Sequence, residues 1–284
     1  MFGRWVASLI ISFGLFACTQ RASESDNTIQ MGLRVNLSAL DPIQASNEAT
    51  GEVVPNIFEG LLQYHYLKRP LTVIPRLAES LPEVSKDGLT HKFKIRSGIT
   101  FHDSEAFPGG KGRAVTANDF IYSWKRLADP KSKSDGWWIF DGKIKGLNEW
   151  RDAIAKGTGK FEDPVEGLQA PDGRTLVIKL SRPYYQLNYV LTMPYASVVP
   201  KEAVDKYGEE FMNHPVGTGP FKFESWIRGN KVTLVKNPGW HGETYRPKET
   251  PATKSAAYST MPAKPFPSWT NWFSTRRRKN SPAG

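Results

Sequence analysis

The sequence predicts an α/β protein, and three observations carry that prediction. Residues 89–96 alternate between apolar and basic side chains, which is the period of a strand with one buried face. Residues 115–127 then place apolar side chains at helical spacing behind a capping signal. Further alternating segments meet at Asp172-Gly173 and Gly229-Asn230, which are hairpin signals. Strands and helices therefore follow one another along 284 residues, enough for one large or two ordinary domains.

The first 28 residues are predicted to be a signal peptide and a tether. An apolar run after Arg4 is too short to span a bilayer and is typical of a signal peptide. It ends in Leu-Phe-Ala-Cys at Cys18, which resembles a bacterial lipobox. We therefore expect residues 1–18 to be a lipoprotein signal, with Cys18 carrying a lipid that anchors the protein to a membrane. An ordinary secretory signal with a chance cysteine is the alternative. Residues 19–28 are polar and predict a flexible tether.

Alternation and turn signals predict the strands. The first covers residues 29–37, with one face made by Leu33, Val35 and Leu37. In residues 89–96 the apolar face holds Leu89, Phe93 and Ile95. Residues 165–180 are predicted to form a hairpin. In its second strand Leu176, Ile178 and Leu180 point to the same face. Residues 221–227 and 232–235 form the last hairpin.

Helical spacing and capping residues predict the helices. Thr116 is the expected N-cap of the helix at 115–127, with Asp119 as a capping-box partner. Its apolar stripe consists of Phe120, Ile121, Trp124 and Leu127, and the first, third and fourth of these are expected in the core. A helix at 143–156 has a stripe of Ile144, Leu147, Trp150 and Ile154. Pro200 begins a short helix at 201–207, and Gly208 ends it.

Three segments are ambiguous between packing and ligand binding. Residues 49–62 are helical in period, but Pro55 predicts a kinked helix or one that begins near it. Trp137 and Trp138, adjacent on a loop, either line a ligand cleft or plug the base of a domain, and we favour packing for one of them. The turn Gly217-Thr218-Gly219 either exposes main-chain groups to a ligand or is a plain tight turn.

Residues 77–130 resemble the segment that identifies the extracytoplasmic solute-binding proteins of the oligopeptide, dipeptide and nickel ABC transporters. A second likeness lies at 215–240, and together with shorter matches the resemblance covers residues 28–245. The matching words are LAES, DGLTHKFKIRSGITFHD, AVTANDFIYSWKRLADP, NIFEGLL and PVGTGPFKFESWIRGNKVTLVKNPGW. Several separate matches in the right order are far more specific than one short motif.

The resemblance implies a periplasmic-binding-protein fold of class II, of the type C lobed form. It places residues 29–59 and 181–245 in an incomplete first ligand-binding lobe and residues 60–180 in an inserted second domain. In this family the segment at Ser46, Asn47 and Glu48 meets the ligand's backbone or amino end. The residues themselves equally predict that Ser46 and Asn47 are caps and Glu48 a solvated first-turn charge.

The function implied by the resemblance is peptide capture. Two lobes close noncovalently on an oligopeptide outside the cytoplasmic membrane and present it to a permease. We expect a monomer. The same fold binding nickel, haem or another small solute is a rival, and a basic nucleic-acid or membrane-surface binding protein is a rival of another class.

The composition changes near residue 245. Residues 246–284 hold eight basic residues and one acidic residue, so they carry +7 of the chain's net charge of +10. They also hold six prolines and no sustained apolar period. We expect a disordered or out-of-frame tail, and a truncated copy that binds peptide poorly. The basic run at 276–279 has no aromatic or helical frame, so no nucleic-acid site is predicted.

No set of residues predicts catalysis or a resident cofactor. The chain lacks the G-x-S-x-G and H-E-x-x-H motifs, so it is not predicted to be an enzyme. One cysteine excludes a disulfide framework within the chain. No metal site is predicted either, because the histidines are scattered without ligand spacing. Among them, His102 with Asp103 is expected to be an ordinary polar pair on an exposed loop.

Overall fold

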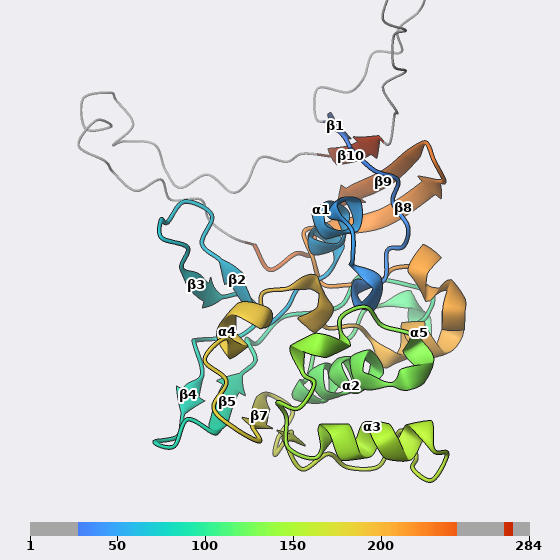
Figure 1. The fold of residues 1–284 in the computed structure, drawn as a ribbon. Coiled ribbons are helices and arrows are strands. Elements are labelled where there is room, and N and C mark those ends of the chain that lie inside the picture. The colour runs from blue at the N-terminus through green and yellow to red at the C-terminus, as the bar shows by residue number, and fades with distance from the viewer. Residues whose placement is uncertain (1–27, 243–269, 275–284) are drawn as a thin grey trace, which may run out of the picture.

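The computed structural model describes residues 28–242 and 270–274, and it confirms the α/β prediction (Figure 1). The α-helices are α1 Glu48–Ile57, α2 Ala117–Ala128, α3 Leu147–Ala155, α4 Leu187–Val190 and α5 Lys201–Tyr207. The strands before α2 are β1 Thr28–Gly32, β2 Leu62–Tyr64, β3 Val73–Pro75, β4 Glu83–Val84 and β5 Thr90–Lys94. The later strands are β6 Leu168–Gln169, β7 Thr175–Lys179, β8 Phe221–Ile227, β9 Lys231–Lys236 and β10 Thr270–Ser274.

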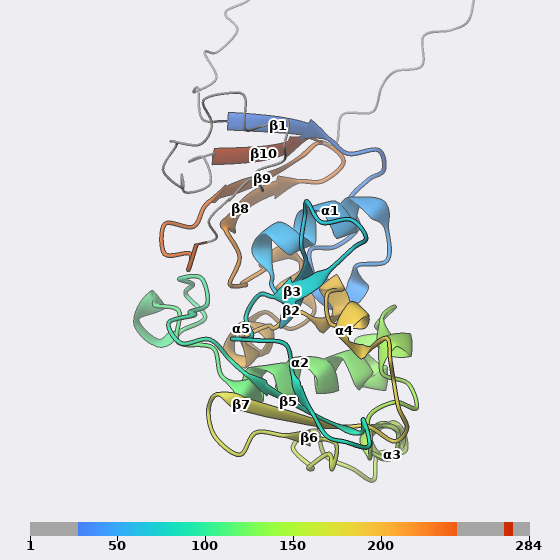
Figure 2. The ribbon, with the colours of Figure 1, turned by 90° about the vertical axis from the view of Figure 1, so that its left-hand side faces the viewer.

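The first of two four-stranded sheets has the strand order β1-β10-β9-β8, with α1 packed against it (Figure 2). The β8–β9 hairpin turns at the predicted Gly229-Asn230 and runs from the pair Phe221↔Lys236 to the pair Ile227↔Lys231. Val232 and Leu234 of β9 are buried in the core that also holds the apolar side of α1. The predicted last hairpin is therefore confirmed.

The second sheet has the order β4-β5-β7-β6 and is antiparallel throughout. Phe93 and Ile95 are buried while Lys92 and Lys94 are exposed, as the alternation predicted. On β7 and just after it, the predicted inward residues are buried too, namely Leu176, Ile178 and Leu180. Helix α2 packs on this sheet through β6 and β7. A separate two-stranded hairpin, β2–β3, projects beside α4 (Figure 2).

Helix α2 begins with the predicted capping box. The Asp119 carboxylate accepts a hydrogen bond from the Thr116 amide at 2.8 Å and another from its hydroxyl at 2.9 Å. Phe120, Trp124 and Leu127 are fully buried, so the stripe is core as expected.

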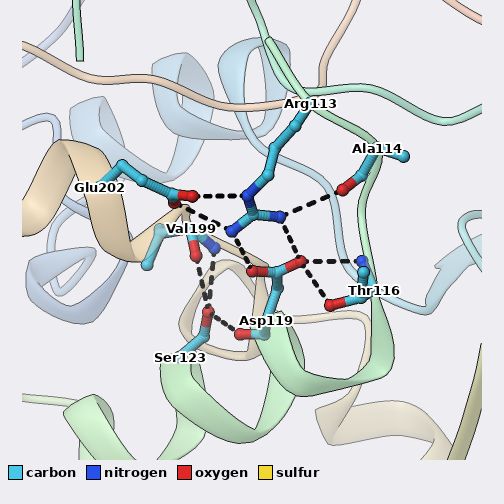
Figure 3. Close-up of polar contacts among 7 residues, drawn as sticks. All are labelled: Arg113, Ala114, Thr116, Asp119, Ser123, Val199 and Glu202. Atoms are coloured by element: carbon cyan, nitrogen blue, oxygen red, sulfur yellow. Dashed lines mark hydrogen bonds and ion pairs between the residues drawn. The ribbon is translucent and has the colours of Figure 1, made fainter. Parts of the chain in front are cut away.

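Arg113 ties α2 to α5 (Figure 3). Its guanidinium makes paired hydrogen bonds to Asp119 at 2.7 and 2.9 Å and to Glu202 at 2.6 and 2.9 Å. Beneath it, the Ser123 hydroxyl donates to the Asp119 carbonyl and accepts from the Val199 amide. Residues from both sides of the expected domain boundary near 181 therefore share one polar network.

Four element predictions differ in detail from the structure. β1 ends at Gly32, and Val35 is 46% exposed because the chain has by then left the sheet. α1 runs from Glu48 to Ile57 and includes Pro55 in its last turn, so it does not begin at the proline, whose missing amide removes one helical hydrogen bond. α3 begins only at Leu147, because Ile144 forms a β-bridge with Leu180 instead. Pro200 is the N-cap of α5 rather than its first residue.

The expected tail is partly in the fold. Its five described residues, Thr270–Ser274, form β10 between β1 and β9. Composition alone did not suggest this main-chain pairing on both edges, and the disordered or out-of-frame tail stays a prediction. The remainder of 246–284 lies outside the described residues.

The predicted signal peptide, with Cys18, also lies outside the described residues. Thr28, the last residue of the expected tether, is the first residue of β1. Across residues 28–242 and 270–274, no helix combines the length and the apolar character needed to cross a membrane.

Candidate ligand-binding lobe

Two of the predicted ligand residues are exposed to solvent at the N-terminus of α1. We call this segment, residues 46–48, the shoulder of α1. Ser46 and Glu48 are exposed, and a carboxylate oxygen of Glu48 lies 3.6 Å from the guanidinium of the more exposed Arg34. Asn47 is the N-cap: its side-chain oxygen accepts from the Thr50 amide at 2.9 Å, and its amide donates to Ser38 at 2.8 Å. The capping interpretation therefore holds for Asn47. The Ser46 hydroxyl and the Glu48 carboxylate are placed where a ligand could reach them.

The loop that carries Trp137 and Trp138, residues 131–141, is hydrogen-bonded to Ile43, which precedes the shoulder in the chain. The Ile43 carbonyl accepts hydrogen bonds from the Ser134 hydroxyl at 2.9 Å and from the Asp135 amide at 3.2 Å. Trp137 is half-buried, with the Arg151 guanidinium 4.9 Å from its ring centre, whereas Trp138 is 56% exposed. One tryptophan therefore packs, as favoured from the sequence, and the other is exposed on the same loop.

The turn at Gly217, Thr218 and Gly219 does not expose its main chain. The Gly219 amide donates to Ile57 at 2.8 Å, and the Gly217 carbonyl accepts from the His102 amide at 2.7 Å. A Cβ atom on Gly217 would lie 2.0 Å from the Ile57 carbonyl oxygen, so glycine is required by close packing. The turn lies at the C-terminal end of α1, about 15 Å from the shoulder for a ten-residue helix. The packing supports the alternative of a plain tight turn, and contact of these three residues with a ligand stays a prediction.

A buried carboxylate holds this end of the lobe together. The Glu59 side chain is 0% exposed and accepts from Arg76 Nε at 2.8 Å and from the Thr218 hydroxyl at 2.8 Å. Trp240 Nε1 lies 3.2 Å and His241 Nε2 3.0 Å from its oxygens. Sequence reasoning missed Glu59, although one signal was present: an acidic residue inside the apolar run NIFEGLL must find partners when buried.

The charge of Glu59 is stabilised by these partners. Burial alone would raise the pKa of this carboxyl, but hydrogen bonds and positive charge from His241 and Arg76 outweigh it and lower the pKa from 4.5 to about 2. The carboxylate is thus ionised near neutral pH, and it fixes the residues that follow α1 against the turn at 217–219.

His102 is buried, so the expectation of an exposed polar pair is wrong for it. Its Nε2 lies 2.9 Å from the Gly219 carbonyl, and its Nδ1 faces the Gly217 amide. That arrangement fits a neutral ring with the proton on Nε2. Burial lowers the pKa of His102 to about 4. Asp103 alone remains on the surface, paired with Lys111 at 2.8 Å.

Acid should therefore destabilise the fold in two steps. His102 has a lower pKa when folded than the ordinary 6.5, so the unfolded chain binds more protons, and stability is lost as pH falls from about 6.5 through 4. Glu59 adds a second loss as pH falls from about 4.5 through 2. Each step is worth about 3 kcal/mol at most. Urea unfolding measured at pH 7, 5.5 and 4.5 checks the first step, which His102→Asn should flatten. Equal stability of the parent protein at pH 7 and 4.5 would contradict the prediction.

Among the residues that the structure describes, no group of three or more His, Cys, Asp or Glu side chains could hold a metal ion. The exposed side chains of Ser46 and Glu48 can donate and accept hydrogen bonds and present a negative charge, and the exposed Trp138 offers an aromatic surface. These are the means of noncovalent recognition of a polar, partly apolar solute.

Comparison with known families agrees with this geometry. Residues 72–265 match the model of the bacterial extracellular solute-binding proteins, family 5 Middle. That match covers more than half of the chain. The chain belongs to this family of solute-binding proteins.

Individual relatives of this solute-binding protein carry peptide-related names. The dipeptide-binding protein of Lactococcus lactis subsp. cremoris is 29% identical over 237 residues, 81% of this chain and 40% of that protein. The periplasmic oligopeptide-binding protein OppA of Salmonella typhimurium is 31% identical over 205 residues, 71% of this chain and 34% of that protein. The structure of Listeria monocytogenes OppA bound to peptide superposes with a TM-score of 0.63 at 26% identity, covering 77% of this chain and 40% of that one. The chain therefore spans about two fifths of the length of such relatives.

Proposed function

We propose that this chain is the peptide-contacting lobe of the solute-binding component of an ABC transporter. In this proposal it captures oligopeptides outside the cytoplasmic membrane and delivers them to a permease without chemical change. The observation that carries the proposal is the start of α1, where Ser46 and Glu48 are exposed, together with the exposed Trp138 on a loop that is hydrogen-bonded to Ile43. The names of the relatives support the ligand class.

Each of these exposed residues suits one part of a peptide. The Glu48 carboxylate is suited to the positive amino end, since opposite charges attract where a ligand excludes water. The Ser46 hydroxyl can pair with the peptide backbone, and the Trp138 ring offers a flat apolar surface to a side chain. Glu59 and the turn at 217–219 do not contact the peptide in this proposal. They support the site indirectly, because they hold the C-terminal end of α1 in place.

The affinity of this chain alone should be low. A ligand that touches one lobe keeps most of its surface in water, whereas a closed cleft buries most of it. Weak binding is therefore expected when residues 1–284 are tested by themselves as a monomer.

Ligand-observed NMR with trialanine and N-acetyl-trialanine tests the proposal. The free amino form should bind the full chain more tightly. Glu48→Gln should weaken its binding about fivefold, which is about 1 kcal/mol for a partly exposed ion pair. In the variant, acetylation should then make little further difference, because the two changes remove the same interaction.

Glu52→Gln is the matched control, since Glu52 is exposed one turn further along α1. It should leave the affinity unchanged. Nickel, haem and single amino acids serve as competing solutes. Binding of one of these in preference to trialanine, or equal binding of both peptide forms to the parent and to Glu48→Gln, would refute the proposal.

Anchoring through Cys18 is part of the same proposal and has its own test. The motivation is the lipobox-like end of the apolar run. Mass spectrometry of the mature N-terminus should find Cys18 as the first residue with a diacylglyceryl group. A soluble mature form that begins at another residue would remove the anchor from the proposal.

A further inference from the structure

Exposed apolar side chains gather on the β2–β3 hairpin and the adjoining α4. Twelve large apolar side chains are exposed among the residues that the structure describes, and five of them lie here. We call these five the hairpin patch: Tyr64, Tyr66, Leu67, Leu71 and Tyr189. The rings of Tyr64 and Tyr189 have their centres 6.4 Å apart, which joins the hairpin to α4. Single exposed apolar side chains are ordinary, but a cluster of them marks an interaction surface.

The tip of the hairpin, residues 65–72, is held in shape by its own polar groups. The ring nitrogen Nδ1 of His65 accepts hydrogen bonds from the amides of Leu67 at 3.2 Å and Lys68 at 3.3 Å. The guanidinium of Arg69 donates to the Lys68 carbonyl at 2.9 Å. The hairpin projects from the body of the fold (Figure 1), and Leu67 and Leu71 are exposed on its tip. A fixed, projecting tip therefore presents leucine side chains to its partner.

The segments that form the patch are positively charged. Residues 60–78 and 181–195 contain four basic residues and no Asp or Glu. One of the four, Arg76, is paired with the buried Glu59. The other three are exposed and form no ion pair with a residue that the structure describes, namely Lys68, Arg69 and Arg182. Uncompensated positive charges thus accompany the apolar side chains, and they favour an anionic partner.

An anionic lipid bilayer matches this combination of side chains. It has an apolar interior beneath a charged surface, so a projecting leucine can enter it, and tyrosine is enriched at the level of the headgroups. Basic side chains near such a surface are attracted to the anionic headgroups, which raises the affinity about fivefold per charge. A soluble anion would supply the charge but no apolar interior.

We propose that the hairpin patch is a contact site for the surface of an anionic lipid bilayer. Leu67 and Leu71 enter the headgroup region, the tyrosine rings lie beside them, and the cations of the tip face the lipid phosphates. The site shares no residue with the shoulder of α1 and does not require a lipid at Cys18. It therefore stands or falls independently of the proposed peptide uptake and anchoring.

A fluorescent label at single positions of the full chain tests the contact. Nitrobenzoxadiazole is attached to Leu67→Cys in a Cys18→Ser background. Leu81→Cys in the same background is the control, because Leu81 is a similarly exposed leucine outside the patch. Vesicles of equal parts phosphatidylglycerol and phosphatidylcholine should shift the emission of the label at position 67 to the blue, and the label at position 81 should not respond. Phosphatidylcholine alone, or added salt, should reduce the shift.

Charge variants of the labelled protein test the part played by the cations. Lys68→Gln combined with Arg69→Gln should raise the lipid concentration needed for half of the shift by about twentyfold. The matched control, Lys156→Gln with Lys160→Gln, removes two exposed charges elsewhere and should leave that concentration unchanged.

Three results would overturn the proposal. The first is no shift at position 67 in protein that sediments with the vesicles, and the second is an equal shift at position 81. The third is a shift produced without vesicles by inorganic phosphate, by an oligonucleotide or by a raised protein concentration. The occupant of the patch would then be a free anion, a nucleic acid or a second copy of the chain.

Discussion

Trp124→Ala should lower the free energy of unfolding by about 3–5 kcal/mol, the usual cost of truncating a buried aromatic residue. Trp124 is 0% exposed and lies in the middle of α2. Its ring contacts Phe120 and Phe140, with centroids 6.0 and 5.1 Å away. Its Nε1 also donates to the Ala196 carbonyl at 3.1 Å, so alanine would leave both a cavity and an unpaired buried acceptor.

Urea unfolding followed by circular dichroism measures this loss, with Trp138→Ala as the control. Trp138 is mostly exposed, so its replacement should change stability by less than about 0.5 kcal/mol. A cost below about 1 kcal/mol for Trp124→Ala, with unchanged cooperativity, would show that α2 does not carry the core.

Glu59→Gln should cost about 3–5 kcal/mol, because removing one partner of a buried ion pair leaves the other charge uncompensated. Glutamine keeps the size of the side chain and part of its hydrogen bonding, so the change tests charge rather than packing. Arg76, whose Nε lies 2.8 Å from the carboxylate and whose side chain is mostly buried, would lose its counter-charge. The side chains of Thr218 and Trp240 would share a weaker acceptor.

Thermal and urea unfolding at pH 7 measure the effect of Glu59→Gln. Glu52→Gln serves again as the control, since an exposed carboxylate on α1 should contribute less than about 0.5 kcal/mol. The Glu59 variant should also lose the part of the acid response expected between pH 4.5 and 2. A variant as stable as the parent at pH 7 would mean that the neutral hydrogen bonds alone hold this end of the lobe.

Local patterns succeeded where local physics decides the structure. The capping box at Thr116 and Asp119 lies within one helical turn, and the alternation around Phe93 requires only a sheet with one buried face. The hairpin at Gly229-Asn230 likewise depends on a few adjacent residues. Prediction was less accurate where tertiary pairing competed with local preference, as at Ile144, which pairs with Leu180 instead of extending α3.

In the candidate site, too, the features set by neighbouring residues were predictable and those set by tertiary contacts were not. Exposed Ser46, capping Asn47 and exposed Glu48 follow from the start of a helix, so their positions could be foreseen. Which of Trp137 and Trp138 packs could not be foreseen, since it depends on Arg151 and on the hydrogen bonds of the loop to Ile43.

By itself, the sequence determined the α/β class, the strand at 89–96, the helix at 115–127 and the likeness to solute-binding proteins. Each of these depends on residues close together in the chain. The tertiary structure alone decided that Gly217 and Gly219 are packed against Ile57 and that His102 is buried beside them. It also decided that the buried Glu59 carboxylate contacts both Arg76 and His241, which are far apart in the sequence. A buried charge selects its partners by distance in space, and residues separated by as many as 182 positions become neighbours only when the chain is folded.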